Sequence, residues 1–241
     1  KSTYGFEEED FVSAELEVVP SGSPRDLGFD RTMILAYGQD DRSCAFASAW
    51  AMFNSGIQKR TSCCLFVDKE EIGSVGATGM QSRFFENTVA ELINLSTTYS
   101  ELKVRHAMEN TKMLSSDVSA GFDPLYAGVN DPKNAEYLGN GICFNKYTGS
   151  RGKSGCNDAM PEYMAEIRKV MDDNNINYQT AELGRVDQGG GGTIAYILGN
   201  YNMNVIDAGI AVLNMHAPME IVSKVDVYEA YVGYKTFLDL K

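Results

Sequence analysis

Apolar residues along the chain fall into two patterns, and the alternation of these patterns predicts the fold class. Short apolar runs typical of strands alternate with longer stretches whose apolar residues recur at helical spacing, as Phe46, Trp50 and Phe53 do. This alternation favours an α/β layered fold in one domain, because no repeat or Pro-rich linker divides the chain. The expected strands span residues 32–37, 63–67, 112–116, 142–146, 176–180, 205–206 and 210–213. The expected helices span residues 43–54, 80–94, 161–172 and 226–239, and a further helix begins near residue 193.

Acidic residues and one histidine follow directly after several of the expected strands. In open α/β sheets, ligands bind outside the carboxyl ends of the strands, so these side chains are expected to converge on one rim. Unpaired carboxylates at such close range would raise one another's pKa, whereas two divalent cations would supply about four compensating charges. The pattern therefore predicts a metal site. The residues concerned are Asp40, Glu70, Glu71, Asp117 and His216.

Each of these residues also has a simpler local interpretation. Asp40 and Asp41 stand where a helix N-cap belongs, and His216 follows an apolar strand as a structural histidine would. The adjacent pair Glu70 and Glu71 is harder to explain locally, because neighbouring side chains on an extended segment point in different directions. One carboxylate of the pair could then bind a metal while the other faces a substrate.

A run of glycines precedes the helix expected near residue 193. The backbone N–H groups of residues 189–192 could hold an anion, but the run lacks the Lys-Ser/Thr ending of a P-loop and the spacing of a dinucleotide site. Close approach of the backbone to a ligand or metal fits better, and Gly190 is expected to line the substrate site. Cysteine and serine nucleophiles lack support, because the chain has two histidines, no recognisable nucleophilic cysteine motif and no GxSxG. Of the histidines, His106 lies among charged residues and is expected on the solvated surface.

Composition and charge narrow the classes of partner. The chain has 241 residues with 21 Lys and Arg against 33 Asp and Glu, which gives a formal net charge of −12 at pH 7. Such acidity argues against binding nucleic acid or an anionic membrane, because both attract basic patches. No apolar run reaches the roughly 20 residues that cross a bilayer. The five cysteines form no CxxC pair and are expected to be reduced thiols, which favours the cytoplasm.

Six segments carry a combination of motifs that is more specific than any one of them. They are YGQDDRSCAF, VDKEEIGSVGATGMQSRFFE, LSSDVSAGFDP, KYTGSRGKSG, GRVDQGGGGTIA and MHAPMEIVSKVDVYEAY. In this order, and over nearly the whole chain, they resemble the aspartyl aminopeptidase family of dinuclear zinc exopeptidases. The resemblance implies a three-layer α/β/α sandwich with a central mixed sheet.

The resemblance also implies a role for each residue of the predicted rim. Asp40 matches a carboxylate that bridges two Zn²⁺ ions, and the peptide bond after it is often cis in this wider class of enzymes. Glu71 and His216 match ligands of one zinc, and Asp117 matches a ligand of the other. Glu70 matches the general base that activates water. Mn²⁺ and Co²⁺ are expected to substitute for zinc.

Substrates and assembly follow from the same resemblance. The family removes acidic amino-terminal residues, Asp or Glu, from peptides, and a basic side chain in the pocket would explain that preference. Lys146, Arg151 and Lys153 lie in one short segment and are the candidates, with Lys146 first; a solvated basic loop is their simpler interpretation. Family members form homo-oligomers, dimer-based tetrahedral dodecamers that enclose the active sites, and the same assembly is expected here.

The chain departs from the family pattern at its beginning. Family members resemble a longer chain in which an early His-x-Asp segment supplies another zinc-binding histidine and an inserted dimerisation domain follows. This sequence has no histidine before residue 106 and does not begin with Met. Residues 1–241 are therefore expected to form a single metallopeptidase catalytic domain without those parts. The alternative is an incomplete, catalytically inactive metal-binding or assembly module.

Overall fold

Two mixed β-sheets lie at the centre of the computed structural model, which describes residues 2–150, 154–185, 187–188, 190–192 and 194–240. One sheet has five strands in the order β1-β2-β11-β10-β4, and the other has four in the order β3-β9-β5-β8. A separate hairpin consists of β6 and β7. The strands are β1 Arg25–Leu27, β2 Met33–Ala36, β3 Lys112–Ser115, β4 Ser119–Ala120, β5 Ile142–Asn145, β6 Tyr147–Ser150, β7 Ser154–Asp158, β8 Tyr178–Ala181, β9 Asn204–Gly209, β10 Ala211–Leu213 and β11 Glu220–Ser223.

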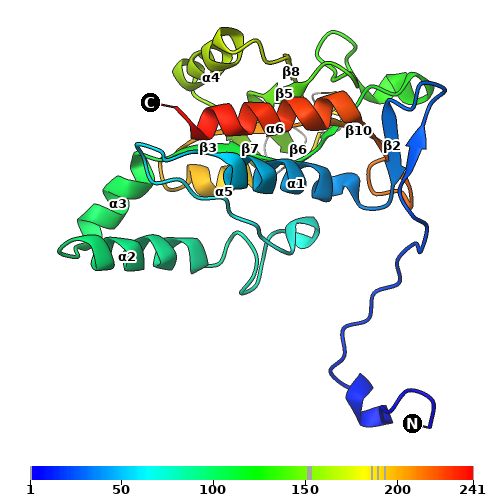
Figure 1. Ribbon diagram of the computed structural model, residues 1–241, viewed down its shortest axis with the longest axis horizontal. Helices are drawn as coiled ribbons and strands as arrows, with labels where there is room; N and C mark the ends of the chain where they lie inside the picture. Colours follow the sequence, from blue (N-terminus) through cyan, green and yellow to red (C-terminus); the bar gives the residue numbers. More distant parts are fainter. Residues whose placement is uncertain (1, 151–153, 186, 189, 193, 241) are drawn as a thin grey trace.

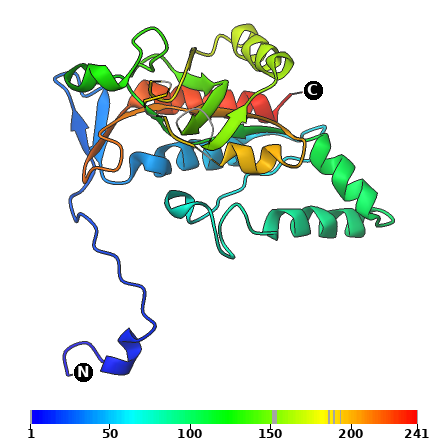
Figure 2. The ribbon, with the colours of Figure 1, turned by 180° about the vertical axis from the view of Figure 1, so that it is seen from behind.

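Helices cover both faces of the four-stranded sheet. Ile206 and Ala208 of β9 belong to one hydrophobic core, which includes buried residues of α1, α4 and α6, whereas Val205 belongs to a second core that includes α5. Successive side chains of a strand point to opposite faces, which explains this division. Figure 1 shows α6 in front of the strands, and the reverse view in Figure 2 shows α5 in front of them. The expected α/β class is confirmed. The helices are α1 Gln39–Asn54, α2 Phe84–Ser96, α3 Glu101–Glu109, α4 Pro161–Asp173, α5 Ala195–Gly199 and α6 Lys224–Leu238, and shorter 3-10 helices span Glu8–Phe11, Glu70–Ile72 and Pro124–Val129.

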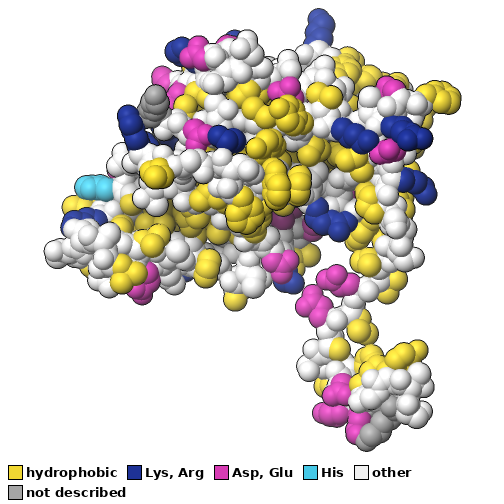
Figure 3. Space-filling model, in the orientation of Figure 1, with side chains coloured by type: hydrophobic (Ala, Val, Ile, Leu, Met, Phe, Trp, Pro, Cys, Tyr) yellow, Lys and Arg dark blue, Asp and Glu magenta, His cyan; other side chains and the backbone are white. Residues whose placement is uncertain are grey.

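Helix α1 is apolar on both its inner and its outer face. Its small inner residues Ala47 and Ala51 are fully buried and belong to the core shared with α6. On the outer face Phe46 and Trp50 stack with ring centroids 5.8 Å apart, and these two residues and Phe53 are exposed. Figure 3 shows the hydrophobic side chains gathered over this part of the molecule.

The strand expected over residues 63–67 is absent, and that prediction is wrong. The segment has no regular secondary structure and pairs with no strand among the described residues. Leu65 and Val67 still pack against the second hydrophobic core, whereas Phe66 is exposed. The apolar run therefore reflects partial burial of a loop against the second core, and a short apolar run alone does not distinguish such a loop from a strand.

The pattern did not predict strands β1, β4 and β11, the hairpin of β6 and β7, or helix α3. The polar segment expected to be a loop after β5 contains the hairpin of β6 and β7. The charged segment around His106 forms α3, whose N-cap Ser100 accepts a hydrogen bond from the Lys103 N–H at 3.2 Å. His106 itself is exposed, as predicted.

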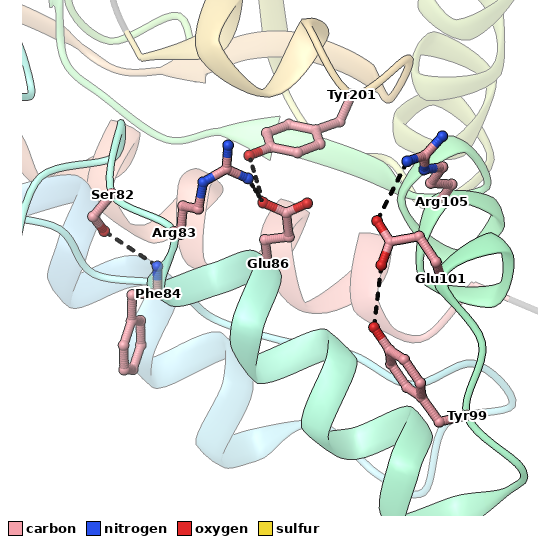
Figure 4. A network of polar contacts seen from close by, with 8 residues as sticks. All are labelled: Ser82, Arg83, Phe84, Glu86, Tyr99, Glu101, Arg105 and Tyr201. Carbon is pink, nitrogen blue, oxygen red and sulfur yellow. Dashed lines mark hydrogen bonds and ion pairs between the residues drawn. The ribbon is translucent and has the colours of Figure 1, made fainter.

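Helices α2 and α3 carry a surface network in which each glutamate meets a cation and a tyrosine hydroxyl (Figure 4). Arg83 Nη1 lies 2.6 Å from Oε2 of Glu86, and the Tyr201 hydroxyl donates to the same oxygen at 3.5 Å. Glu101 accepts from Arg105 at 3.4 Å and from the Tyr99 hydroxyl at 3.2 Å. Glu86 and Glu101 are therefore compensated by neighbouring donors.

The segment before β1 extends away from the sheets, as Figures 1 and 2 both show.

All five cysteines are free thiols, as expected. Among the described residues, none of the helices combines the length and the apolar character that crossing a membrane requires.

Candidate metal centre

Asp40 and Asp41 lie at the start of α1, directly after β2. The N-cap of α1 is Gly38, with a φ of 67°, and it makes no side-chain cap. Asp40 has a φ of −81° and a ψ of 110°, which is extended backbone, and the Asp40–Asp41 peptide bond is cis. The interpretation of the two aspartates as N-caps is therefore wrong, whereas the cis peptide implied by the resemblance is present.

The imidazole of His216 faces two carboxylates from distant parts of the chain. Its Nε2 lies 3.0 Å from Oδ2 of Asp40 and 3.0 Å from Oε1 of Glu71. His216 lies in the turn between β10 and β11, and Glu71 lies in the 3-10 helix Glu70–Ile72. One donor atom from each of the three residues lies within 4.8 Å of the others. An imidazole nitrogen and two carboxylate oxygens at this spacing match a Zn²⁺ ligand set.

A second group of donors shares Asp40 with the first. Donor atoms of Asp40, Asp41 and Asp117 all lie within 4.8 Å of one another. Asp117 follows β3 and lies against the end of β9, where a Cβ on Gly209 would stand only 1.6 Å from the Asp117 carbonyl oxygen. Only glycine permits that approach. The structure thus brings together the four metal ligands expected from the sequence.

Glu70 lies beside this group, next to Glu71. Burial raises the pKa of Glu70, and the carboxylates of Glu71 and Asp40 raise it further. The turn that carries the pair is closed by a backbone hydrogen bond of 2.7 Å from the Ser74 N–H to the Lys69 carbonyl oxygen. Glu70 therefore lies close enough to Glu71 and Asp40 for their charges to raise its pKa.

Negative charge accumulates at this rim. Burial, and then Glu71, raise the pKa of Asp40 to about 6. Burial also raises the pKa of Asp41 to about 8, with Asp40 adding to it, and raises that of Asp117 well above its usual range. Among the described residues, the buried Oδ1 of Asp41 has no hydrogen-bond partner. Carboxylates that repel one another and leave an oxygen unpartnered fit a divalent cation, so the residues present fit zinc.

Two residues near the rim were missed by sequence reasoning. The sequence pattern assigns Asp41 only to a helix cap, although it contributes a donor to the second group. Glu220 is 2% exposed and accepts hydrogen bonds from the backbones of Asp40 and His216. One sequence feature could have identified Glu220. It lies four residues after His216 at the start of a short apolar run, where a buried charge without a partner would be costly.

Two of the expected substrate-binding residues, Lys146 and Gly190, lie beside the β6-β7 hairpin. Lys146 forms an ion pair with Asp158 across the base of the hairpin. Arg151 lies outside the described residues, as does Lys153. Gly190 has a φ of 88°, and a Cβ there would stand 2.8 Å from the carbonyl oxygen of Gly149. Gly190 thus lies close to the backbone of the hairpin, at Gly149.

The acidic rim forms part of the wall of a groove of about 1370 Å³. Asp40, Glu70 and Asp117 lie on the acidic part of its lining, and apolar residues such as Leu65 and Val89 line the rest. A concave, mostly apolar site with a few converging polar groups is typical of a ligand-binding site.

Comparisons with known proteins agree with this geometry. The family model of the aminopeptidase I zinc metalloproteases (M18) matches residues 1–238. The "Probable M18 family aminopeptidase 1" of Clostridium acetobutylicum is 63% identical over 236 residues, which cover 98% of this chain and 51% of that protein. The crystal structure of the M18 family aminopeptidase from Thermotoga maritima superposes with a TM-score of 0.95 at 45% identity and covers 99% of this chain and 53% of that one.

A more distant structure shares the fold. The S. cerevesiae mApe1 dodecamer superposes with a TM-score of 0.75 at 21% identity, over 91% of this chain and 48% of that one. The chain therefore spans about half the length of the relatives that it matches.

Proposed function

Because the chain belongs to the aminopeptidase I zinc metalloprotease (M18) family, we propose that residues 1–241 act as a single metallopeptidase catalytic domain that releases amino-terminal residues from peptides. The observation that carries the proposal is the convergence of Asp40, Glu71 and His216 on one point, with Nε2 of His216 3.0 Å from both carboxylates. Asp40 and Glu71 also line the groove, which would give a peptide access to them.

Two zinc ions are proposed, with Mn²⁺ or Co²⁺ as substitutes. Asp40, Glu71 and His216 would hold one ion, and Asp40 and Asp117 would hold the other, with Asp41 beside it. When bound, zinc supplies Lewis acidity towards the scissile carbonyl.

Glu70 is proposed as the general base. Its carboxylate accepts a proton from the water whose oxygen attacks the scissile carbonyl carbon, and then gives that proton to the leaving amine as the C–N bond breaks. The products are a free amino acid and a peptide shortened by one residue. Burial of Glu70 beside two other carboxylates supports this role, because both raise its pKa towards neutrality.

The Glu70→Gln variant tests the proposal. We expect it to keep its zinc and to lose turnover by about 10²–10⁴-fold, because the amide cannot accept the proton. Glu101→Gln, on the exposed face of α3, is the control and keeps full activity. Retained turnover in Glu70→Gln would refute the role of Glu70, and zinc binding without hydrolysis by the unchanged chain would identify a metal-binding module instead.

An acidic amino-terminal preference is proposed for the substrate, with Lys146, Arg151 and Gly190 lining its pocket. Asp-, Glu- and Leu-leading peptides should differ in kcat/KM, and Lys146→Met should reduce the rate for the acidic ones alone. Lys169→Met, which removes an exposed lysine from α4, is the matched control. Equal rates for the three peptides would refute the preference.

A homo-oligomer, the dimer-based tetrahedral dodecamer, is proposed for the assembled enzyme. Support comes from the yeast neighbour, which was solved as a dodecamer. Light scattering of the purified chain measures its mass directly, and a monomer at micromolar concentration would refute the assembly for this chain. The five free cysteines favour a reducing compartment, and we propose the cytoplasm.

A further inference from the structure

One buried carboxylate joins the two backbones that carry Asp40 and His216. Oε2 of Glu220 accepts the Asp40 N–H at 3.1 Å, and Oε1 accepts the His216 N–H at 2.7 Å. Glu220 is the first residue of β11, pairs with Ala36 of β2 and is 2% exposed. Its two oxygens therefore face the backbone groups beneath the site, at the end of the sheet from which both ligands arise.

The two ligands depend on loops that do not fix their own conformation. His216 has a φ of 65°, which residues with a Cβ rarely adopt. Asp40 has extended backbone inside the first turn of α1, so the regular hydrogen bonds of the helix do not hold it. A hydrogen-bond acceptor that binds both N–H groups at once fixes the distance between the two loops.

We propose that Glu220 is a positioning residue for the metal site, whose carboxylate holds Asp40 and His216 so that Oδ2 and Nε2 meet one cation. The inference rests on the proposed function, because it requires that Asp40 and His216 bind zinc. Groups that orient metal ligands typically change metal affinity by about 10–100-fold when they are replaced. A carboxylate suits this position because it offers two acceptor oxygens, whereas an amide offers one and directs its NH₂ at an N–H.

A second buried carboxylate of the same design provides a matched control. Asp226 at the start of α6 is fully buried, and its Oδ2 and Oδ1 accept the Gly139 and Gly141 N–H groups at 2.7 and 2.8 Å. It belongs to neither group of metal donors. Asp226→Asn therefore disturbs a pair of hydrogen bonds of the same kind and should destabilise the fold in the same way. It leaves the proposed metal ligands in place.

The test measures Zn²⁺ affinity by competition with a chromophoric chelator, and the absorption spectrum with Co²⁺, in the unchanged chain and in Glu220→Gln and Asp226→Asn. We expect Glu220→Gln to bind Zn²⁺ about 10–100-fold more weakly and to shift the Co²⁺ spectrum. We expect Asp226→Asn to unfold at a lower temperature with unchanged affinity and spectrum. Glu220→Asp, which keeps the charge but shortens the side chain, is expected to lose affinity as well and serves if Glu220→Gln does not fold.

Each outcome decides between the alternatives. Equal zinc affinity in the unchanged chain and in either Glu220 variant would overturn the positioning role and leave the metal site standing. Equal losses in the Glu220 variants and in Asp226→Asn would also overturn it, because the effect would then come from general destabilisation. An unchanged chain that binds no zinc would overturn both the inference and the proposed function.

Discussion

The α2-α3 surface network and the metal rim are both rich in acids, but their carboxylates have opposite surroundings. Glu86 and Glu101 each receive an arginine and a tyrosine hydroxyl (Figure 4). At the rim, Asp40 and Glu71 share a single imidazole nitrogen and face further carboxylates, so that the pKa of Asp40 is raised by its burial and by Glu71. The first arrangement is complete by itself, and the second leaves negative charge for a cation to neutralise.

The number of hydrogen-bond and ion-pair donors around a carboxylate therefore distinguishes acids that stabilise the fold from acids that bind a ligand. A buried or half-buried carboxylate with two donors contributes to stability, whereas carboxylates that crowd together reduce it and persist where they bind something. Four changes test this contrast, from the largest expected effect to the smallest.

Asp40→Asn should have the largest effect, because Asp40 belongs to both groups of donors. We expect Zn²⁺ affinity to fall at least about 100-fold, since replacing a ligand costs more than replacing a group that orients one. Chelator competition measures the loss. Affinity within twofold of the unchanged chain would show that this rim does not hold the metal.

The pH dependence of the metal-free chain should follow the raised pKa values. The pKa of Asp40 is about 6 in the folded protein against an ordinary value of 3.8, so the folded chain binds a proton that the unfolded chain has released between about pH 4 and pH 6. Stability should therefore rise by about 1 kcal/mol from pH 7 to pH 5, because the folded chain takes up most of this proton as the pH falls through about 6.

Urea unfolding at the two pH values, with a chelator present, measures that rise. In Asp40→Asn the rise should be smaller, and saturating zinc should reverse it, because the metal competes with protons for the same oxygens. The same pH dependence in both proteins would contradict the raised pKa of Asp40.

Glu86→Gln should have a smaller effect and none on metal. Its carboxylate is partly exposed and binds Arg83 and Tyr201, so its replacement should cost about 0.5–1 kcal/mol of unfolding free energy. Thermal unfolding with and without zinc measures both quantities. A change in zinc affinity would show that the two acidic regions are coupled.

Glu101→Gln should have the smallest effect. Its arginine partner is 73% exposed, and solvent screens ion pairs of that kind. The unfolding midpoint should stay within error of the unchanged chain. A large loss would mean that the α2-α3 network contributes far more to stability than its exposure implies.

The sequence predicted which side chains meet at the rim better than it predicted the residues that hold them there. Asp40, Asp117 and His216 could be recognised because acids and a histidine recur after apolar runs, whether or not each run forms a strand. The run at residues 63–67 forms no strand, yet Glu70 and Glu71 still reach the rim, because burial alone orients the loop that precedes them.

Contacts between distant segments could not be predicted. The sequence pattern predicts no element at Glu220, and only the pairing of β11 with β2 brings its carboxylate beneath Asp40. Asp41 reads as a helix cap, and only the approach of Asp117 places it in a donor group. These contacts depend on sheet register, which a single sequence does not encode locally.

Anomalous diffraction at the zinc edge, from crystals of the unchanged chain grown with Zn²⁺, tests the central claim most directly. We expect a peak within bonding distance of Asp40, Glu71 and His216, and a second beside Asp40 and Asp117. Peaks confined to surface sites, with Nε2 of His216 still in contact with Asp40 and Glu71, would contradict that claim.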